Sequence, residues 1–190
     1  MYIRLLALLA LYVFVFARDG EDIEAKKFYQ YVLPANISTS LYLVGYSSEL
    51  YHSNIKCVKS YYSKWTGKSV ERHLLMDVYD QGKKNFTGFT INITFRPDPI
   101  IFSINISDVH GGLVERTGAL STYQVLHYDN DTMLLGNIRA TYSEKPLCSL
   151  WANDKYYRTE KERLPHMTRI TFQWNCKDPE FIQYPGECFP

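Results

Sequence analysis

The sequence predicts an all-β protein, either a barrel or a sandwich, and two observations support this fold class. The first is the alternation of apolar and polar residues along Asn85–Ser107, which indicates two strands that each have one apolar and one polar face. Pro97 and Pro99 lie between the two runs, where their missing amide hydrogens interrupt no sheet hydrogen bond. The second is a series of about eight or nine strand-like segments, spaced by roughly 10 residues with no helical pattern between them.

The polar face of these two strands carries N-glycosylation sequons at Asn92 and Asn105. A glycan must point to solvent, so the sequons and the alternation assign the same face to the outside. The opposite face should therefore cover a core or a cavity. Its residues are Phe89, Ile91, Ile93, Phe95, Ile100, Phe102, Ile104 and Ile106.

The remaining elements follow from the same kind of pattern. Glu21–Leu33 has acidic residues first and lysines later, which predicts a short amphipathic helix ending before Pro34. Met167–Trp174 alternates in steps of two, with Ile170, Phe172 and Trp174 on one face, and is predicted to be a strand. The other expected strands are Leu41–Tyr46, Ile55–Lys64, Ser69–Tyr79, Leu120–Tyr128, Thr132–Arg139 and Leu147–Ala152.

The N-terminus predicts secretion. Residues 1–17 combine Arg4, an apolar run and a terminal Ala17, and the run is shorter than the roughly 20 residues needed to span a membrane. We expect a signal peptide over residues 1–17 and a single domain over residues 18–190. The chain has 21 Lys and Arg against 20 Asp and Glu, so no charged field points to nucleic acid or to an anionic membrane.

The four cysteines fit an extracellular protein with two disulfides. Sequence alone leaves all three possible pairings of four cysteines open. No CxxC motif is present, and we expect no metal site. The cysteines are Cys57, Cys148, Cys176 and Cys188, and the five glycosylation sequons that support secretion begin at Asn36, Asn85, Asn92, Asn105 and Asn130.

The sequence contains no pattern typical of an enzyme or of a cofactor-binding protein. The five histidines are scattered, and no nucleophile elbow, phosphate loop or dinucleotide fingerprint occurs. His110-Gly111-Gly112 is interpreted as a turn. Asp77 and Tyr79 share one strand face. If this face is buried, the Asp77 carboxylate could bind a cationic ligand; the alternative, a solvated outer face, has at least equal weight. We expect a barrel that holds one small ligand without catalysis or cofactor.

The C-terminal half resembles a known family. Cys148-Ser149-Leu150-Trp151, then Cys176 followed by Phe181, then Cys188, is similar to the tick salivary lipocalins of the histamine-binding protein family. The expected N-terminal helix and Cys57 on an early strand extend the likeness. The resemblance implies an eight-stranded antiparallel lipocalin barrel with a short N-terminal helix and a C-terminal helix or tail. It also implies the disulfides Cys57–Cys188 and Cys148–Cys176, and we expect a monomer.

The chain departs from this family where amine-binding members carry acids. Met133 stands in place of an aspartate and Ser149 in place of a glutamate. Ser48 falls near a third acidic position, with Glu49 as a possible substitute. Burying an ammonium without a counter-charge costs several kcal/mol, on the order of the penalty for any unpaired buried charge. These departures favour an apolar or amphipathic ligand over histamine or serotonin.

We therefore expect the barrel to bind a sterol, fatty acid or eicosanoid. Arg72 and Arg139 are candidate partners for a ligand carboxylate, although we expect both to reach outward to water, as long basic side chains usually do. The resemblance also implies suppression of host defence. The expected lining comprises Phe89, Ile91, Ile93, Phe102, Ile104, Tyr123, Met133, Ser149 and Trp151.

Two alternatives remain open. The first is capture of histamine or serotonin through Glu49 or Asp77. The second is binding of a host immune protein or cell through the loops Ser47–Asn54 or Asn153–Pro165.

Overall fold

The computed structural model describes residues 33–96, 102–138, 144–156, 163–182 and 188. The predicted signal peptide, all but the last residue of the predicted N-terminal helix, and Arg139 lie outside the described residues. Leu33, the last residue of that expected helix, precedes a short 3-10 helix, η1 (Pro34–Asn36).

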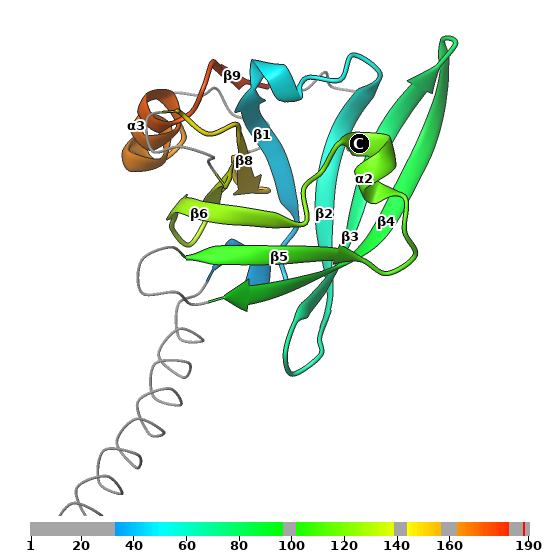
Figure 1. Cartoon of the computed structure of the whole chain (residues 1–190), viewed down its shortest axis with the longest axis horizontal. Helices are drawn as coiled ribbons and strands as arrows, with labels where there is room; N and C mark the ends of the chain where they lie inside the picture. Colours follow the sequence, from blue (N-terminus) through cyan, green and yellow to red (C-terminus); the bar gives the residue numbers. More distant parts are fainter. Residues whose placement is uncertain (1–32, 97–101, 139–143, 157–162, 183–187, 189–190) are drawn as a thin grey trace, which may run out of the picture. The chain divides into compact units, whose positions relative to one another are not determined.

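Eight antiparallel strands close into a barrel (Figure 1), which confirms the predicted fold class. The first strand, β1, pairs with β8 on one side and with β2 on the other, and these pairings close the sheet. A ninth short strand, β9 (Pro179–Phe181), pairs with the other end of β1. The barrel strands are β1 (Leu41–Ser47), β2 (Ile55–Trp65), β3 (Val70–Asp80), β4 (Lys83–Arg96), β5 (Ser103–Asp108), β6 (Thr122–Tyr128), β7 (Thr132–Asn137) and β8 (Cys148–Asn153).

The alternation along β4 and β5 matches the expected faces. Ile91 and Ile93 are buried in the barrel interior, and Ile104 on β5 is fully buried. On the outer face the two sequons lie in register, with Asn92 opposite Ser107 and Thr94 opposite Asn105.

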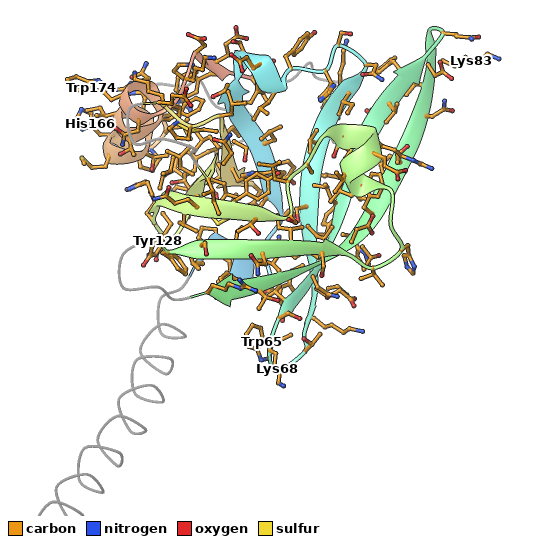
Figure 2. The ribbon with its side chains drawn as sticks, viewed as in Figure 1. Trp65, Lys68, Lys83, Tyr128, His166 and Trp174 are labelled. Atoms are coloured by element: carbon orange, nitrogen blue, oxygen red, sulfur yellow. A yellow bond between two sulfur atoms is a disulfide. The ribbon has the colours of Figure 1, made fainter. Side chains whose placement is uncertain are left out.

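The two ends of the barrel differ. At one end η1 contacts both β2 and β7, so it crosses the end of the barrel and closes it. At the other end lie the short 3-10 helix η2 (Ser48–Leu50), which follows β1, and a helical turn, α2 (Leu113–Thr117), between β5 and β6. In Figure 2, Trp65 and Lys68 mark the β2–β3 turn, and Lys83 marks the β3–β4 turn at the opposite end of the long hairpin.

The apolar residues form two separate cores. One fills the barrel interior and includes Met76, Ile91, Ile104 and Met133. The other lies between the outer faces of β1, β7 and β8 and the helix α3 (His166–Asn175), with Phe172 fully buried in it. Strands β7 and β8 are therefore apolar on both faces, as expected for strands covered on two sides.

The prediction of a strand over Met167–Trp174 is wrong, because this segment is helix α3. Thr168 and Phe172 are the buried positions, four residues apart, whereas Trp174 is 74% exposed. Figure 2 shows Trp174 and His166 on the side of α3 that faces away from the barrel. Ile170, Phe172 and Trp174 do alternate, but a strand there would require all three to share one buried face. Of the three, Phe172 is fully buried, Ile170 is partly buried and Trp174 is exposed, and the helical period matches this burial.

Two disulfides link the described residues in the pairing that the family resemblance implies. Cys57 on β2 is bonded to Cys188, across 131 residues. Cys148 on β8 is bonded to Cys176, the residue that follows α3. The second bridge holds α3 against the outside of the barrel.

Within the described ranges, no helix has both the length and the apolar character required to traverse a lipid bilayer.

Candidate ligand-binding cavity

The barrel interior contains a wide compartment of about 690 Å³ that opens at the end opposite η1. This volume falls in the range of roughly 300–1,000 Å³ typical of sites for drug-sized ligands. Apolar side chains from facing strands dominate its walls, including Leu43, Leu74, Met76 and Trp151. Burial of a ligand's apolar surface in this compartment therefore makes the free energy of binding more favourable.

The mouth of this compartment is lined by the connection between β1 and β2 and by the segment after α2. Tyr46 and Tyr51 stack with their ring centroids 5.9 Å apart. Burial raises the pKa of Tyr46, and the negative charge of Glu180 raises it further. Glu49, one of the two acids considered for amine binding, also lies at the mouth and forms an ion pair with Lys177.

A β-bulge shapes one side of the wide compartment. Cys57 on β2 has a positive φ of 53°, and the pairing with β3 shifts register between Lys56 and Lys59. Four consecutive residues, from Ile55 to Val58, consequently border the cavity, whereas a regular strand would present every second one.

A narrow compartment of about 90 Å³ extends from the wide one toward the closed end. Ile91, Ile93, Ile104 and Met133 contribute to its apolar wall. It also touches the buried residues Ser60 and Arg72 at the closed end.

Arg72 is fully buried, so the expectation that it points outward is wrong. Its guanidinium donates to the Ser60 hydroxyl and to four carbonyl groups, those of Ala35, Ile37, Thr39 and Ser60, at 2.6–3.2 Å. These acceptors overcome the usual preference of arginine for water, because they belong to the segment that crosses the closed end. Burial lowers the pKa of Arg72 to about 10, which leaves the side chain protonated at neutral pH.

The five N–H groups of an arginine can make five hydrogen bonds, and Arg72 makes five. No donor therefore remains for a ligand carboxylate. Arg72 has a structural role, because its hydrogen bonds link β2 and β3 to the segment before β1.

Tyr123 on β6 and Ser149 on β8 border both compartments, together with Leu74, Ala119 and Trp151. The Tyr123 hydroxyl accepts a hydrogen bond from the amide of Leu120 at 2.7 Å. The Ser149 hydroxyl accepts one from Nε1 of Trp151 at 3.0 Å. The junction between the compartments is thus apolar apart from these hydroxyl groups and the indole N–H.

Most of the residues expected to line the pocket border one of the compartments, while two do not. Phe89 belongs to the buried interior core, and Phe102 packs against that core with its ring 6.1 Å from that of Tyr128. Those that border the cavity are Ile91, Ile93, Ile104, Tyr123, Met133, Ser149 and Trp151.

The second acid considered for amine binding lies elsewhere. Asp77 does not border either compartment and instead pairs with Lys84 of β4 at 2.8 Å. Glu49 is consequently the only acidic side chain among the described residues that border the cavity, and Lys177 neutralises it. Across the described ranges, no group of three or more His, Cys, Asp or Glu side chains could hold a metal ion.

Sequence reasoning missed Leu74 and Met76 on β3 as lining residues. Their signal was available, because Val70, Arg72, Leu74 and Met76 alternate in steps of two. The charge of Arg72 at the second of these positions masked the apolar face.

Comparisons with known proteins place the chain in a family. No protein-family model matches it. It is 30% identical over 159 residues to Japanin from Rhipicephalus appendiculatus, and the match covers 83% of this chain and 85% of Japanin. The chain belongs to the Japanin family. This membership confirms the predicted resemblance to tick salivary lipocalins.

Other similarities agree with the Japanin assignment. Japanin-like-RS from Rhipicephalus sanguineus is 29% identical over 159 residues, covering 83% of this chain and 85% of that protein. A solved structure of Japanin from Rhipicephalus appendiculatus bound to cholesterol matches with a TM-score of 0.70 and 28% identity, over 82% of this chain and 99% of that chain. Lobster apocrustacyanin A1 matches with a TM-score of 0.55 at 12% identity, over 90% of this chain and 88% of that one, and supports the fold alone.

Proposed function

We propose that this chain is a secreted, non-catalytic carrier that sequesters a neutral molecule of sterol size inside its barrel. The observation that carries the proposal is the apolar cavity of about 690 Å³ together with its narrow extension. Among the described residues, the one cation that borders this extension is Arg72, which already makes five protein hydrogen bonds. The related Japanin is bound to cholesterol, which supports the same ligand class here.

The closed end favours a sterol over a fatty acid or an eicosanoid. An ionised carboxylate buried in an apolar site needs a cation or several donors, since its unpaired burial is costly. All five N–H groups of Arg72 already donate to protein acceptors, so none is left to bind a ligand carboxylate. A neutral hydroxyl or carbonyl needs only one hydrogen bond, so a sterol enters the same cavity at a smaller desolvation penalty.

The same reasoning disfavours an amine. An ammonium ion needs an unpaired carboxylate, and Glu49 at the mouth is occupied by Lys177. Asp77 is buried away from both compartments and pairs with Lys84.

Secretion and action on the host are part of the proposal. The apolar N-terminal run, the five sequons and the two disulfides support passage through an oxidising secretory compartment. Membership in the Japanin family supports a role in suppressing host defence, and removing a sterol from host cells is a means consistent with this cavity.

The test is ligand binding by the secreted, deglycosylated protein. Native mass spectrometry with organic extraction identifies any co-purifying lipid, and titrations then compare cholesterol, oleate and histamine. We expect cholesterol to bind at a ratio of one to one and more tightly than the other two. Tight binding of histamine alone would contradict the proposal, and indifference to all three would favour a host protein bound through the loops.

Two adjacent residues supply a matched pair of variants. Leu74 borders both compartments, whereas His73 is exposed on the opposite face of β3. Leu74→Trp fills the cavity and should weaken cholesterol binding by about 10- to 100-fold, given typical overpacking penalties. His73→Trp adds the same indole outside the barrel and should leave the affinity unchanged.

A further inference from the structure

The cavity has polar atoms at its narrowest described point, where the wide and narrow compartments meet. Tyr123 and Ser149 border both compartments and come from strands on either side of β7. Their neighbours at this junction, Leu74, Ala119 and Trp151, are apolar or aromatic. Two residues that carry hydroxyl groups therefore border the junction of a largely hydrophobic cavity.

Each hydroxyl has one hydrogen left to donate. A hydroxyl can donate one hydrogen bond and accept others. The Tyr123 hydroxyl accepts from the amide of Leu120, and the Ser149 hydroxyl accepts from the indole N–H of Trp151. Among the described residues, no acceptor receives a hydrogen from either hydroxyl. Both donors lie where water would be displaced by a ligand, and a buried donor without an acceptor is unfavourable.

The protonation state of Tyr123 suits this role. Burial raises the pKa of Tyr123 above its ordinary value, and the hydrogen bond from Leu120 offsets only part of this effect. The phenol therefore stays neutral at physiological pH and keeps its hydrogen.

We propose that Tyr123 and Ser149 are the polar anchor of the cavity and donate hydrogen bonds to a neutral oxygen atom of the bound ligand. The assignment rests on the proposed function and adds the orientation of the ligand. The oxygen lies at the inner end of the wide compartment, and the hydrocarbon body extends from there toward the mouth.

Other polar groups that border the cavity are less suited to this role. At the closed end, the Ser60 hydroxyl and the Arg72 guanidinium are bonded to each other and to the backbone. At the mouth, Tyr51, His52 and Lys56 are exposed, so water competes for their hydrogen bonds. Tyr123 and Ser149 differ from these groups because they border both compartments, where the hydrocarbon body of a ligand would exclude water.

The direction of the hydrogen bonds gives a sharp test with ligands alone. Because both protein groups donate, a ligand oxygen without a hydrogen is sufficient. We expect cholesterol and its 3-keto analogue to bind the wild-type protein with affinities within about threefold of each other. The 3-deoxy analogue, which lacks the oxygen, should bind about tenfold more weakly, as expected for one or two lost hydrogen bonds.

Variants identify the donors. Tyr123→Phe removes one hydroxyl and should reduce the preference for cholesterol over the 3-deoxy analogue to about threefold. Tyr123→Phe combined with Ser149→Ala should abolish the preference. Tyr61→Phe removes a hydroxyl from a residue that borders neither compartment, and it should keep the wild-type preference. Circular dichroism of each variant checks folding, and the ligand series on the wild-type protein does not depend on any variant.

The outcomes separate the two proposals. Equal binding of all three sterols by the wild-type protein would overturn the polar anchor and leave sterol sequestration intact. A preference that survives in the double variant would likewise overturn it, placing the ligand oxygen elsewhere. Failure of all three sterols to bind would overturn the proposed function and the anchor together.

Discussion

The two apolar cores of the molecule differ in how they use their space. The buried residues of the outer core, between the barrel wall and α3, border neither compartment of the cavity. Phe172 is fully buried there, with its ring 5.1 Å from that of Phe181. The interior core instead surrounds about 690 Å³ of open volume.

The outer core allows this small barrel to remain hollow. An interior cavity forfeits packing contacts that a filled core would make. Here the outer core, the Cys148–Cys176 disulfide and the hydrogen bonds of Arg72 stabilise the fold without occupying the interior. The interior wall is then available to contact a ligand.

The largest expected effect is on the outer core. Phe172→Ala should lower the free energy of unfolding by about 3–5 kcal/mol, because it leaves a cavity in a filled region. Leu74→Ala in the interior should cost less than about 2 kcal/mol, because its side chain already borders open space. Urea denaturation of the ligand-free protein measures both values. An equal or greater loss for Leu74→Ala would show that the two cores are equally filled.

The next effect concerns the closed end of the barrel. Arg72→Met should cost about 3 kcal/mol, because it leaves the buried acceptors of five hydrogen bonds without a donor. Arg72→Lys supplies three donors and should have an intermediate effect. The same denaturation measurement applies, and a change within about 0.5 kcal/mol for Arg72→Met would contradict the structural role assigned to this residue.

A smaller effect tests the close approach of β1 to α3. A Cβ atom added at Gly45 would lie 2.8 Å from Cε1 and 3.1 Å from Cζ of Phe172. Gly45→Ala should therefore cost about 1–3 kcal/mol, the usual range for overpacking. In a Phe172→Leu background the same substitution should cost less, because the ring that it meets is gone. Additive losses in this double-mutant cycle would show that the two residues do not interact.

The smallest effect is a pH dependence from the interior. The pKa of Tyr123 is raised in the folded protein, mainly by burial, so above about pH 10 the unfolded chain loses this proton first. The contribution of Tyr123 to stability is full below that pH and decreases as the pH rises. Tyr123→Phe should make the decrease between about pH 8 and about pH 11 shallower by less than about 1 kcal/mol. Part of the decrease should remain in this variant, because burial also raises the pKa of Tyr46. An unchanged pH dependence would show that Tyr123 is accessible to solvent.

The cavity residues illustrate how far sequence reasoning reaches. Ile91, Ile93 and Ile104 were predictable because alternation within a strand is a local property that the chain carries in any barrel. Arg72 shares its strand face with Val70 and Leu74, but its charge led to the wrong prediction that its side chain points outward. Its burial depends on carbonyl groups of residues 35–39, more than 30 positions away in the chain. No local pattern reports such distant acceptors.

The all-β class, the strand positions through β8 and the family were predictable from the sequence. Strand periodicity is a property of neighbouring residues, and the cysteine motif can be read directly from the chain. The helical conformation of Met167–Trp174 depends on tertiary contacts, because its alternating apolar residues suit a strand equally well. In the folded chain Phe172 packs against Gly45, and Cys176 after α3 is bonded to Cys148 of β8. The same holds for the bulge at Cys57, which brings four consecutive residues to the cavity wall, and for the positions of Tyr123 and Ser149 at the junction of the two compartments. These features depend on contacts between segments far apart in the chain, and such contacts exist only once the barrel has closed.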